Sequence, residues 1–458
     1  MRSNKLVATS AAVIALALIG ASCGKDKKTT DTKVAAETTV AAATTAASAP
    51  ETTVATETTA VAPETTAVAG SAATSGTPQS YSVNVDGKND TFSIAAVAYY
   101  PKELTAHPGD TVTFTSVFTG EPHTVTFGTL VDAGLAKSKP TDRNEPPELA
   151  KIALMIPNGP GDAIQASAQP CYIASGDPPI ADACTAAQHT QPDFDGTQTL
   201  YNSGFLADGE QFKVKLSANI KPGTYSFFCT LHRAGMTGKI TVAAADAKAD
   251  TPDEVVARGQ GELKSLVATL KPAYDDLTKG LFKPFISESK PGSVLAGSGV
   301  QDAAATIAAF GPDPVEAKVG DTITWTVVGP HTITFGANEG LRTVIAKAPD
   351  GGVHLNPASF APVGGAGQPP PPPAPSTTAG AAAADTTPAA APTTAAGPPP
   401  PPIVIDGGSF DGAGLHSSGF ILSFPDQLFS YKVKFTKAGS YPYICLIHPN
   451  MKGTVNVA

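Results

Sequence analysis

Three residue types that bind transition metals lie close together near the C-terminus, in the stretch CLIHPNMKG at residues 445–453. Cys445, His448 and Met451 follow one another at intervals of three residues, although the chain of 458 residues has only five cysteines and four methionines. A thiolate, two imidazoles and a weak thioether form a trigonal copper site that changes oxidation state with little rearrangement. The stretch could supply three of these four ligands, and a second imidazole must come from elsewhere.

His331, in GPHTITF, is the candidate for that second imidazole. The same order occurs earlier in the chain, where His123 in EPHTVTF is followed by Cys229, His232 and Met236 in CTLHRAGM. An isolated residue of these types usually serves packing or surface hydrogen bonding, but the joint order occurs twice. Zinc fits less well, because structural zinc sites favour several thiolates and do not use methionine. We therefore expect two copper ions, one in each set.

Both sets belong to an internal repeat whose segments follow the same order in the two halves. The matched pairs are residues 95–130 and 305–338, residues 194–206 and 410–421, and residues 221–243 and 437–458. Polar residues alternate with β-branched and aromatic ones, as in TVTF and TITF, between turns rich in Gly, Pro and Asp. This alternation predicts antiparallel strands. The sequence therefore predicts an all-β fold with two β-sandwich domains.

Residues 251–272, between the halves, have the pattern of a helix. Thr251 and Glu254 are spaced as a capping box, Pro252 stands in the first turn, and apolar residues recur at helical spacing. We expect this helix to pack against one sandwich or to bridge the two.

Two segments lack the large apolar side chains that a folded core needs. Residues 24–79 are almost all Ala, Thr, Glu, Val and Pro, and residues 368–402 combine polyproline with Ala/Thr repeats. Such compositions predict disordered, solvated segments. The net charge of −9 provides no basic surface for nucleic acid, and partners attracted by charge would be cationic.

The N-terminus has the layout of a secretory signal, with Arg2 and Lys5 before an apolar run that ends in small residues. Cys23 follows the residues GAS and resembles the lipidated cysteine of a bacterial lipobox, although Leu is more usual at the place of Gly20. The alternative is an ordinary cleaved signal with an incidental cysteine. We expect an extracytoplasmic protein, anchored by lipid to the outer face of the bacterial cell membrane or secreted.

At its metal-binding motifs the sequence resembles the cupredoxins, the small blue copper electron carriers such as plastocyanin and amicyanin. The spacing Cys-x-x-His-x-x-Met in the second half is similar to the amicyanin loop, and VGDTITW with PHTITF is similar to the strands before the family's first histidine. In the first half Met236 lies four residues past His232, one more than in amicyanin and one fewer than in plastocyanin. The resemblance implies Greek-key β-sandwiches with type 1 copper.

These observations together predict a domain organisation with five parts and an insert in each sandwich. The parts are a signal peptide at 1–23, a disordered Ala/Thr-rich spacer at 24–79, a cupredoxin-like domain at 80–245 with an insert at about 131–193, a helical linker at 246–290, and a second cupredoxin-like domain at 291–458 with a Pro/Ala-rich insert at about 363–402. Small family members lack such inserts. We expect them to be surface excursions, because lengthening a loop adds only a modest entropic cost.

The first insert carries Cys171 and Cys184 in CYIASGDPPIADAC. In an exported protein, two cysteines across a loop rich in Pro, Gly and Asp favour a disulfide, and the alternative is a pair of unused thiols. The five cysteines would then serve one lipid anchor, one disulfide and two copper sites.

Catalytic relatives must also be considered. Multicopper oxidases and copper nitrite reductases build further copper centres from His-x-His pairs and from a histidine beside the blue-copper cysteine, and the sequence has neither pattern. The other four histidines are scattered and are predicted to lie at the surface, namely His107, His189, His354 and His416. We therefore expect that the protein is not an enzyme and has no small-molecule substrate.

The resemblance implies an electron carrier that passes single electrons between membrane-bound and secreted redox proteins. It also implies that His232 and His448 lie near the surface as electron exits, among mostly apolar neighbours that suit brief docking. Two alternatives stay open. The protein could bind and deliver copper without taking part in a redox circuit, or it could be a β-sandwich adhesion or scaffolding module.

Overall fold

The computed structural model describes eleven segments of the chain. They are residues 77–138, 146–152, 166–179, 183–283, 285–300, 304–337, 345–347, 353–355, 361–364, 401–423 and 427–458. The predicted signal peptide with Cys23, nearly all of the spacer and nearly all of the second insert lie outside them. Within the described segments, no helix combines the length and the apolar character needed to cross a membrane.

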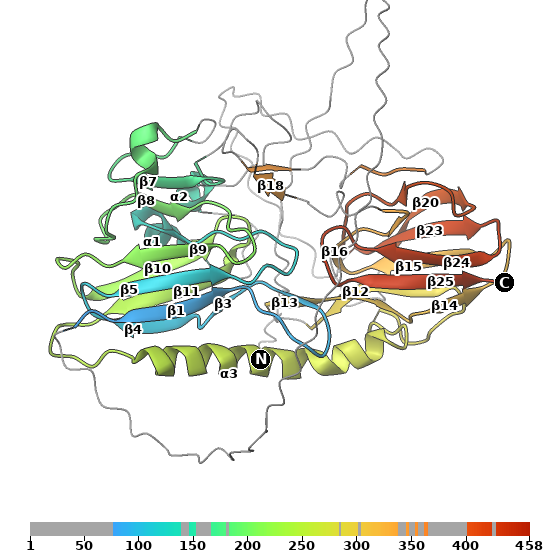
Figure 1. Cartoon of the computed structure of the whole chain (residues 1–458), viewed down its shortest axis with the longest axis horizontal. Helices are drawn as coiled ribbons and strands as arrows, with labels where there is room; N and C mark the ends of the chain where they lie inside the picture. The colour runs from blue at the N-terminus through green and yellow to red at the C-terminus, as the bar shows by residue number, and fades with distance from the viewer. Residues whose placement is uncertain are drawn as a thin grey trace, which may run out of the picture. The chain divides into compact units, whose positions relative to one another are not determined.

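The first half contains two sheets that share one core (Figure 1). One sheet has the order β3-β1-β5-β9, with β3 (Tyr99–Tyr100), β1 (Ser80–Val85), β5 (Thr111–Ser116) and β9 (Gln211–Lys215). The other has the order β4-β11-β10-β6-β8-β7, with β4 (Glu103–Ala106), β11 (Arg233–Val242), β10 (Gly223–Cys229), β6 (Thr126–Phe127), β8 (Leu200–Ser203) and β7 (Pro170–Ile173). Phe114 of one sheet meets Phe227 of the other edge to face, with ring centroids 5.0 Å apart. The two sheets therefore form a sandwich.

The second half repeats this plan. One sheet has the order β2-β13-β12-β15-β23-β20, with β2 (Ile94–Ala96), β13 (Ala305–Gly311), β12 (Ser293–Gly299), β15 (Thr322–Val327), β23 (Phe429–Phe435) and β20 (Ile403–Phe410). The other has the order β14-β25-β24-β17-β21, with β14 (Val315–Ala317), β25 (Lys452–Val457), β24 (Gly439–Ile444), β17 (Thr334–Phe335) and β21 (His416–Ser417). Trp325 lies fully buried between them, with its ring centroid 5.4 Å from that of Tyr443.

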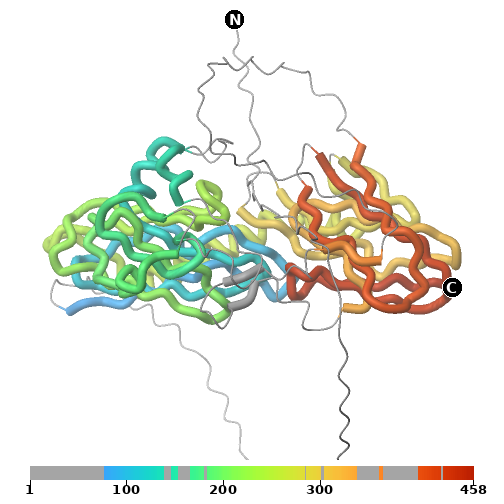
Figure 2. Tube along the Cα trace, turned by 90° about the horizontal axis from the view of Figure 1, so that it is seen from above, coloured from blue at the N-terminus to red at the C-terminus, as the bar shows by residue number. Residues whose placement is uncertain are grey.

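Short strand pairs complete the second half. They are β16 (Gly329–His331) with β22 (Ile421–Ser423), and β18 (Ile345–Lys347) with β19 (Val353–Leu355). The last strand of the second sandwich, β25, pairs with both β24 and β14. Figure 2 shows the C-terminus at the outer end of this half.

The prediction of two β-sandwich domains with a long helix between them is confirmed, but the expectation of antiparallel strands is wrong for several pairs. The parallel pairs are β1 with β5, β4 with β11, β12 with β15, β14 with β25, and β20 with β23. Side chains alternate between the two faces of a strand in either pairing mode, so hydrophobic alternation cannot distinguish them.

The first insert is more closely joined to the fold than a surface excursion. Its strand β7 extends the sheet beside β8, and it also contributes α1 (Thr129–Leu135, which begins just before it), α2 (Pro147–Ala150) and the 3-10 helix η1 (Ala186–His189). Val131, Leu149 and Ile173 form a small core with Phe228 of the main sheet. Its apolar residues thus bury surface against the sandwich, which a solvated loop would not do.

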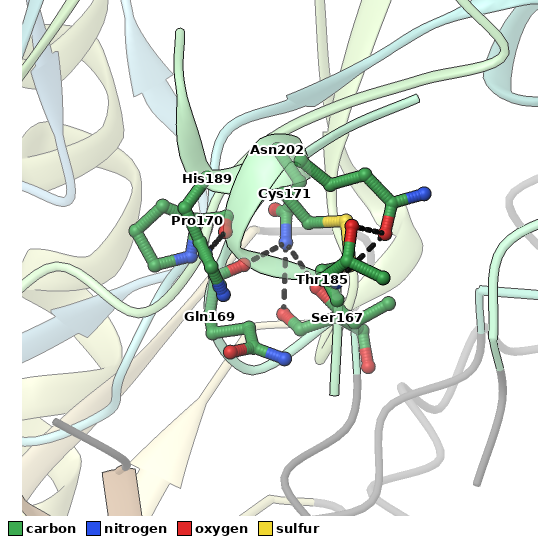
Figure 3. The surroundings of a disulfide bond; sticks show 10 residues. Ser167, Gln169, Pro170, Cys171, Thr185, His189 and Asn202 are labelled. Carbon is green, nitrogen blue, oxygen red and sulfur yellow. Dashed lines mark hydrogen bonds between the residues drawn. A yellow bond between two sulfur atoms is a disulfide. The ribbon is translucent and has the colours of Figure 1, made fainter. Parts of the chain in front are cut away.

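The predicted disulfide between Cys171 and Cys184 is confirmed. Figure 3 shows its surroundings, in which His189 Nδ1 lies 2.7 Å from the Pro170 carbonyl oxygen. The buried Asn202 amide donates to the carbonyl oxygens of Ala166, Ser167 and Gln169 at 2.9, 3.2 and 2.9 Å. The covalent bridge and this amide together hold the insert on strand β8.

The helix α3 (Pro252–Leu277) begins with the predicted capping box. The Glu254 amide donates to Thr251 Oγ1 at 3.2 Å, and the Thr251 amide donates to Glu254 Oε2 at 2.8 Å. The helix continues five residues past the predicted end at 272, with Pro272 inside it. Its last turn buries Leu277, and this packing offsets the hydrogen bond that the proline cannot donate.

A third core joins α3 to both halves of the chain. It contains Ile94 and Ala96 of β2, Leu270 of α3, and Leu295 and Ile307 of the second half. Strand β2 comes from the first half of the sequence but pairs with β13 in the sheet of the second half. The two sandwiches are therefore connected by strand pairing and a shared core, and not by the helix alone.

Two glycines of α3 provide a test of this packing. A methyl group added at Gly259 would lie 2.7 Å from the Tyr100 carbonyl carbon, whereas one added at Gly261 would have no neighbour within 4 Å. Gly259→Ala should lower the free energy of unfolding by roughly 1–3 kcal/mol, because the helix must shift away from β3. Gly261→Ala should raise it by about 0.5–1 kcal/mol through helix propensity. Thermal and urea unfolding followed by circular dichroism measure both, and equal effects would contradict the packing of α3.

Candidate metal centres

The structure brings His123, Cys229 and His232 together in the first half. His123 Nδ1 lies 3.2 Å from His232 Nδ1, and the Cys229 sulfur lies 3.5 Å from His232 Nδ1 and 4.0 Å from His123 Nδ1. All three side chains are buried. One thiol and two imidazole nitrogens therefore face a common point that is closed to bulk water.

Local backbone features position these three residues. Cys229 ends β10 at a point where the register between β10 and β11 shifts, and His232 lies in the turn that follows. His123 forms a β-bridge with Leu206, on the segment that leads into the same sandwich. Met236 lies on β11 and is completely buried. The first imidazole and the thiol thus come from different strand ends, whereas the thiol and the second imidazole share one turn.

The second half repeats the arrangement with His331, Cys445 and His448. His331 Nδ1 lies 3.1 Å from His448 Nδ1, and the Cys445 sulfur lies 3.6 Å from His448 Nδ1 and 3.8 Å from His331 Nδ1. Two backbone hydrogen bonds close the loop, because the Met451 amide donates to the His448 carbonyl at 3.0 Å and the Cys445 amide donates to the Met451 carbonyl at 2.9 Å. Met451 is 1% exposed.

Both cysteines have the electrostatics of a metal-binding thiolate. Burial by itself raises the pKa of the Cys229 thiol, but charge attraction from His232 and hydrogen bonds with His123 and His232 hold that pKa well below its usual range. Burial likewise opposes ionisation of Cys445, and hydrogen bonds with His331 and His448 again hold its pKa well below the usual range. Because the thiolate is the form that binds metal, both donor sets suit a soft metal such as copper.

Hydrogen bonds around each sulfur follow the same pattern in the two halves. The Thr124 amide donates to the Cys229 sulfur at 3.4 Å, and the Thr332 amide donates to the Cys445 sulfur at 3.4 Å. Two buried N–H groups thus support two buried thiolates. Such donors stabilise negative charge on the sulfur and limit its movement.

Two carboxylates that our sequence analysis did not identify lie behind the imidazoles of the first centre. Glu121 Oε2 lies 2.7 Å from His232 Nε2, and Asp86 Oδ2 lies 3.5 Å from His123 Nε2. Glu121 Oε1 also lies 3.6 Å from Nε2 of His448, in the second centre. A metal-bound histidine usually has such a partner on its other nitrogen, which fixes its ring and raises its basicity.

Among the described residues, no carboxylate forms an ion pair with the first histidine of the second centre, His331. Its Nε2 makes no hydrogen bond, as is also the case for His123 Nε2 and His448 Nε2, and it lies beside Gly297, where an added methyl group would come within 2.2 Å. The repeat also differs at the place of the second carboxylate. The residue before Pro-His is Glu121 in the first half and Gly329 in the second.

The expectation that His232 and His448 lie near the surface is wrong. Their exposed fractions are 3% and 0%. Of the mostly apolar neighbours expected to form a docking patch, Leu231, Leu446 and Ile447 are buried, whereas Gly235, Pro449 and Asn450 are exposed. The backbone of Gly120 lies against the Ile447 carbonyl, so the first half covers the metal-binding loop of the second. Sequence motifs specify a loop, but they do not specify what packs on it.

One of the four remaining histidines also differs from its prediction. His416 is 3% exposed and packs beside Phe410, with ring centroids 4.9 Å apart. His189 is exposed as predicted, whereas His107 is partly buried and its Nε2 lies 2.8 Å from the Ala247 carbonyl oxygen. The side chain of His354 lies outside the described part of the structure.

Comparison with known protein families gives a match for one segment of the chain. Residues 180–243, which include Cys229, His232 and Met236, match the family described as copper binding proteins, plastocyanin/azurin family. A comparison with curated proteins gives no match.

Several solved structures are similar to parts of the chain. Reduced auracyanin from the photosynthetic bacterium Roseiflexus castenholzii is 22% identical over 37% of this chain and 100% of its own, with a TM-score of 0.20. An oxidised amicyanin mutant is 15% identical over 36% of this chain and 82% of its own (TM-score 0.18), and a mutant fern plastocyanin is 21% identical over 35% and 99% (TM-score 0.17). TM-scores this low add nothing to the fold assignment, which rests on the strands described above. Residues 180–243 of the first half are therefore similar to the copper binding proteins of the plastocyanin/azurin family, and the second half repeats the Cys, His and Met residues of that segment.

Proposed function

We propose that the protein is an exported, membrane-tethered electron carrier with two type 1 copper centres. The observation that carries this proposal is the pair of buried groups, each with one low-pKa thiol and two imidazoles, and each followed by a buried methionine. Copper bound there supplies one-electron oxidation and reduction with little change in ligand geometry. One ion would be held by His123, Cys229, His232 and Met236.

The other ion would be held in the same way by His331, Cys445, His448 and Met451. In both halves, hydrogen bonds between residues next to the ligands hold the segment of the first histidine against the segment of the cysteine. The Thr230 amide donates to Thr124 Oγ1 at 3.0 Å, and the Leu446 amide donates to Thr332 Oγ1 at 2.7 Å. Each bond ties the residue after the cysteine to the residue after the first histidine.

The burial and hydrogen bonding of the ligand segments favour electron transfer over copper delivery. A carrier must keep the same ligands in both oxidation states, whereas a delivery protein must expose its metal to an acceptor. All six cysteine and histidine ligands are at most 3% exposed. Handing copper to another protein would therefore require opening of the loops that cover it. We propose that one-electron redox proteins are the partners, and that the chain itself catalyses no reaction.

The first prediction concerns colour. In the copper-loaded protein, Cys229→Ser and Cys445→Ser should each remove about half of the intense thiolate-to-copper absorption, because each deletes one of two thiolate ligands. Visible spectra and copper counted per chain measure this. Ser82→Ala, which changes an exposed residue of β1, serves as a control that should keep the full absorption. Wild-type protein with only weak bands, or with its colour unchanged in Cys445→Ser, would refute the two-centre assignment.

The second prediction concerns copper retention. The protein should pass through repeated reduction and oxidation with both copper ions retained, because the ligands are buried and tied by backbone hydrogen bonds. The measurement is copper content after cycling in the presence of a moderate chelator specific for Cu(I). Transfer of one or two copper ions per chain to the chelator on reduction would instead favour the delivery function.

The third prediction concerns the tether. We propose that Cys23 is lipidated and that the Ala/Thr-rich spacer holds the folded domains clear of the membrane. Cys23→Ala protein should then leave the membrane fraction and appear in soluble extracytoplasmic material. Fractionation with detection of the folded domains checks this, and Thr30→Ala in the spacer is the control that keeps Cys23. A mature wild-type N-terminus downstream of Cys23 would rule out the anchor.

A further inference from the structure

The side chain of Glu121 lies between the two metal-binding loops. One carboxylate oxygen lies 2.7 Å from His232 Nε2, and the other lies 3.6 Å from His448 Nε2. The Nδ1 atoms of these same histidines face the two cysteine sulfurs. Each imidazole therefore presents one nitrogen to its metal site and the opposite nitrogen to the shared carboxylate.

This contact is built into the fold. Glu121 is 6% exposed, and His232 and His448 are 3% and 0% exposed. A methyl group added at Gly120 would lie 2.3 Å from the Ile447 carbonyl oxygen, so the loop before Glu121 has no room for a larger residue. Pairing of β2 with β13 and the third core connect the same two sandwiches. The carboxylate is thus enclosed between two loops that the fold holds together.

We propose that the two copper centres form a coupled pair, in which an electron passes from one centre to the other along the connection His232–Glu121–His448. This inference rests on the proposed function, because it requires copper in both sites. The path consists of two imidazole rings, one carboxylate and two contacts across space. The path is short because a single imidazole ring separates each metal site from the Glu121 carboxylate.

The exchange is balanced without any other reactant. One electron leaves the centre that holds Cu(I), which is oxidised to Cu(II), and enters the centre that holds Cu(II), which is reduced to Cu(I). No bond breaks, and the Nε2 protons stay on the imidazoles beside the carboxylate. The first electron comes from a one-electron redox protein, and the same class of protein removes it.

The surroundings of the two centres also imply a direction. In the first centre both imidazoles face a carboxylate, Asp86 behind His123 and Glu121 behind His232. In the second centre His331 has no such partner among the described residues, and Glu121 lies farther from His448 than from His232. Negative charge near a ligand stabilises the more positive oxidised state. The first centre should therefore have the lower potential and pass its electron to the second.

The experiment uses the full-length, copper-loaded protein reduced rapidly with less than one electron per chain. A phase whose rate does not depend on protein concentration should follow reduction, as the electron redistributes between the centres. Glu121→Ala should slow this phase roughly 10-fold or more, and Glu121→Gln should slow it less, because the amide keeps the side chain's shape but loses its charge. Glu103→Gln, which changes an exposed carboxylate of the same half, should leave the phase unchanged.

Two further measurements test the contact through Glu121 and the direction of electron transfer separately from the presence of two copper centres. In metal-free protein, nitrogen-15 NMR should detect Nε2 protons on His232 and His448 that exchange slowly with water, and Glu121→Ala should abolish this protection. Potentials measured on single-centre proteins should be lower for Cys445→Ser, which keeps the first centre, than for Cys229→Ser. Equal potentials, or the opposite order, would overturn the proposed direction.

The possible outcomes distinguish failure of the carrier function from failure of the coupling. Absence of intense blue absorption would refute the proposed function itself. Protein with two blue centres but no concentration-independent phase, or with the same phase in Glu121→Ala, would refute the coupling and leave the carrier function standing. If Glu121→Ala does not fold, the comparison of Glu121→Gln with Glu103→Gln decides, and equal rates in these two variants would overturn the proposal.

Discussion

A cysteine thiolate that is shielded from water must be stabilised by neighbouring groups, and this requirement shapes both metal-binding halves. Burial alone would keep Cys229 and Cys445 protonated, yet both thiols have depressed pKa values because imidazoles surround them. Backbone amides of Thr124 and Thr332 donate to the two sulfurs. These donors lie at fixed strand ends, so the sandwich must position them before any metal can be held. The β-sheets thus provide the rigidity that the chemistry of the site requires.

The repeat produces two centres with the same ligands but different surroundings. Asp86 is completely buried and accepts hydrogen bonds from the amides of Ala96 and Thr119, so its position behind His123 is closely fixed. The corresponding nitrogen of His331 faces a glycine backbone. Identical ligand sets can therefore differ in potential through the charges behind them. A chain with two such centres can favour one direction of electron flow without any change in its ligands.

The connection between the halves gives the repeat a property that a single domain lacks. Strand β2 completes a sheet of the other half, and Leu270 of α3 lies in a core that draws residues from both. The same arrangement buries the two loop histidines that would otherwise face solvent. Apolar residues around these loops therefore serve packing within the chain, where we had expected them to serve docking of a partner.

The sequence by itself determined which cysteines and histidines lie together in each half, the two sandwiches, the helix and the disulfide. Each rests on local spacing or composition, because Cys-x-x-His fits one turn and alternation of side chains defines a half-buried strand. Only the tertiary structure decided which strands pair in parallel, because side-chain alternation is the same in both pairing modes. It also decided that Glu121 meets both His232 and His448, because that contact depends on how two distant loops pack and leaves no periodic pattern in the sequence.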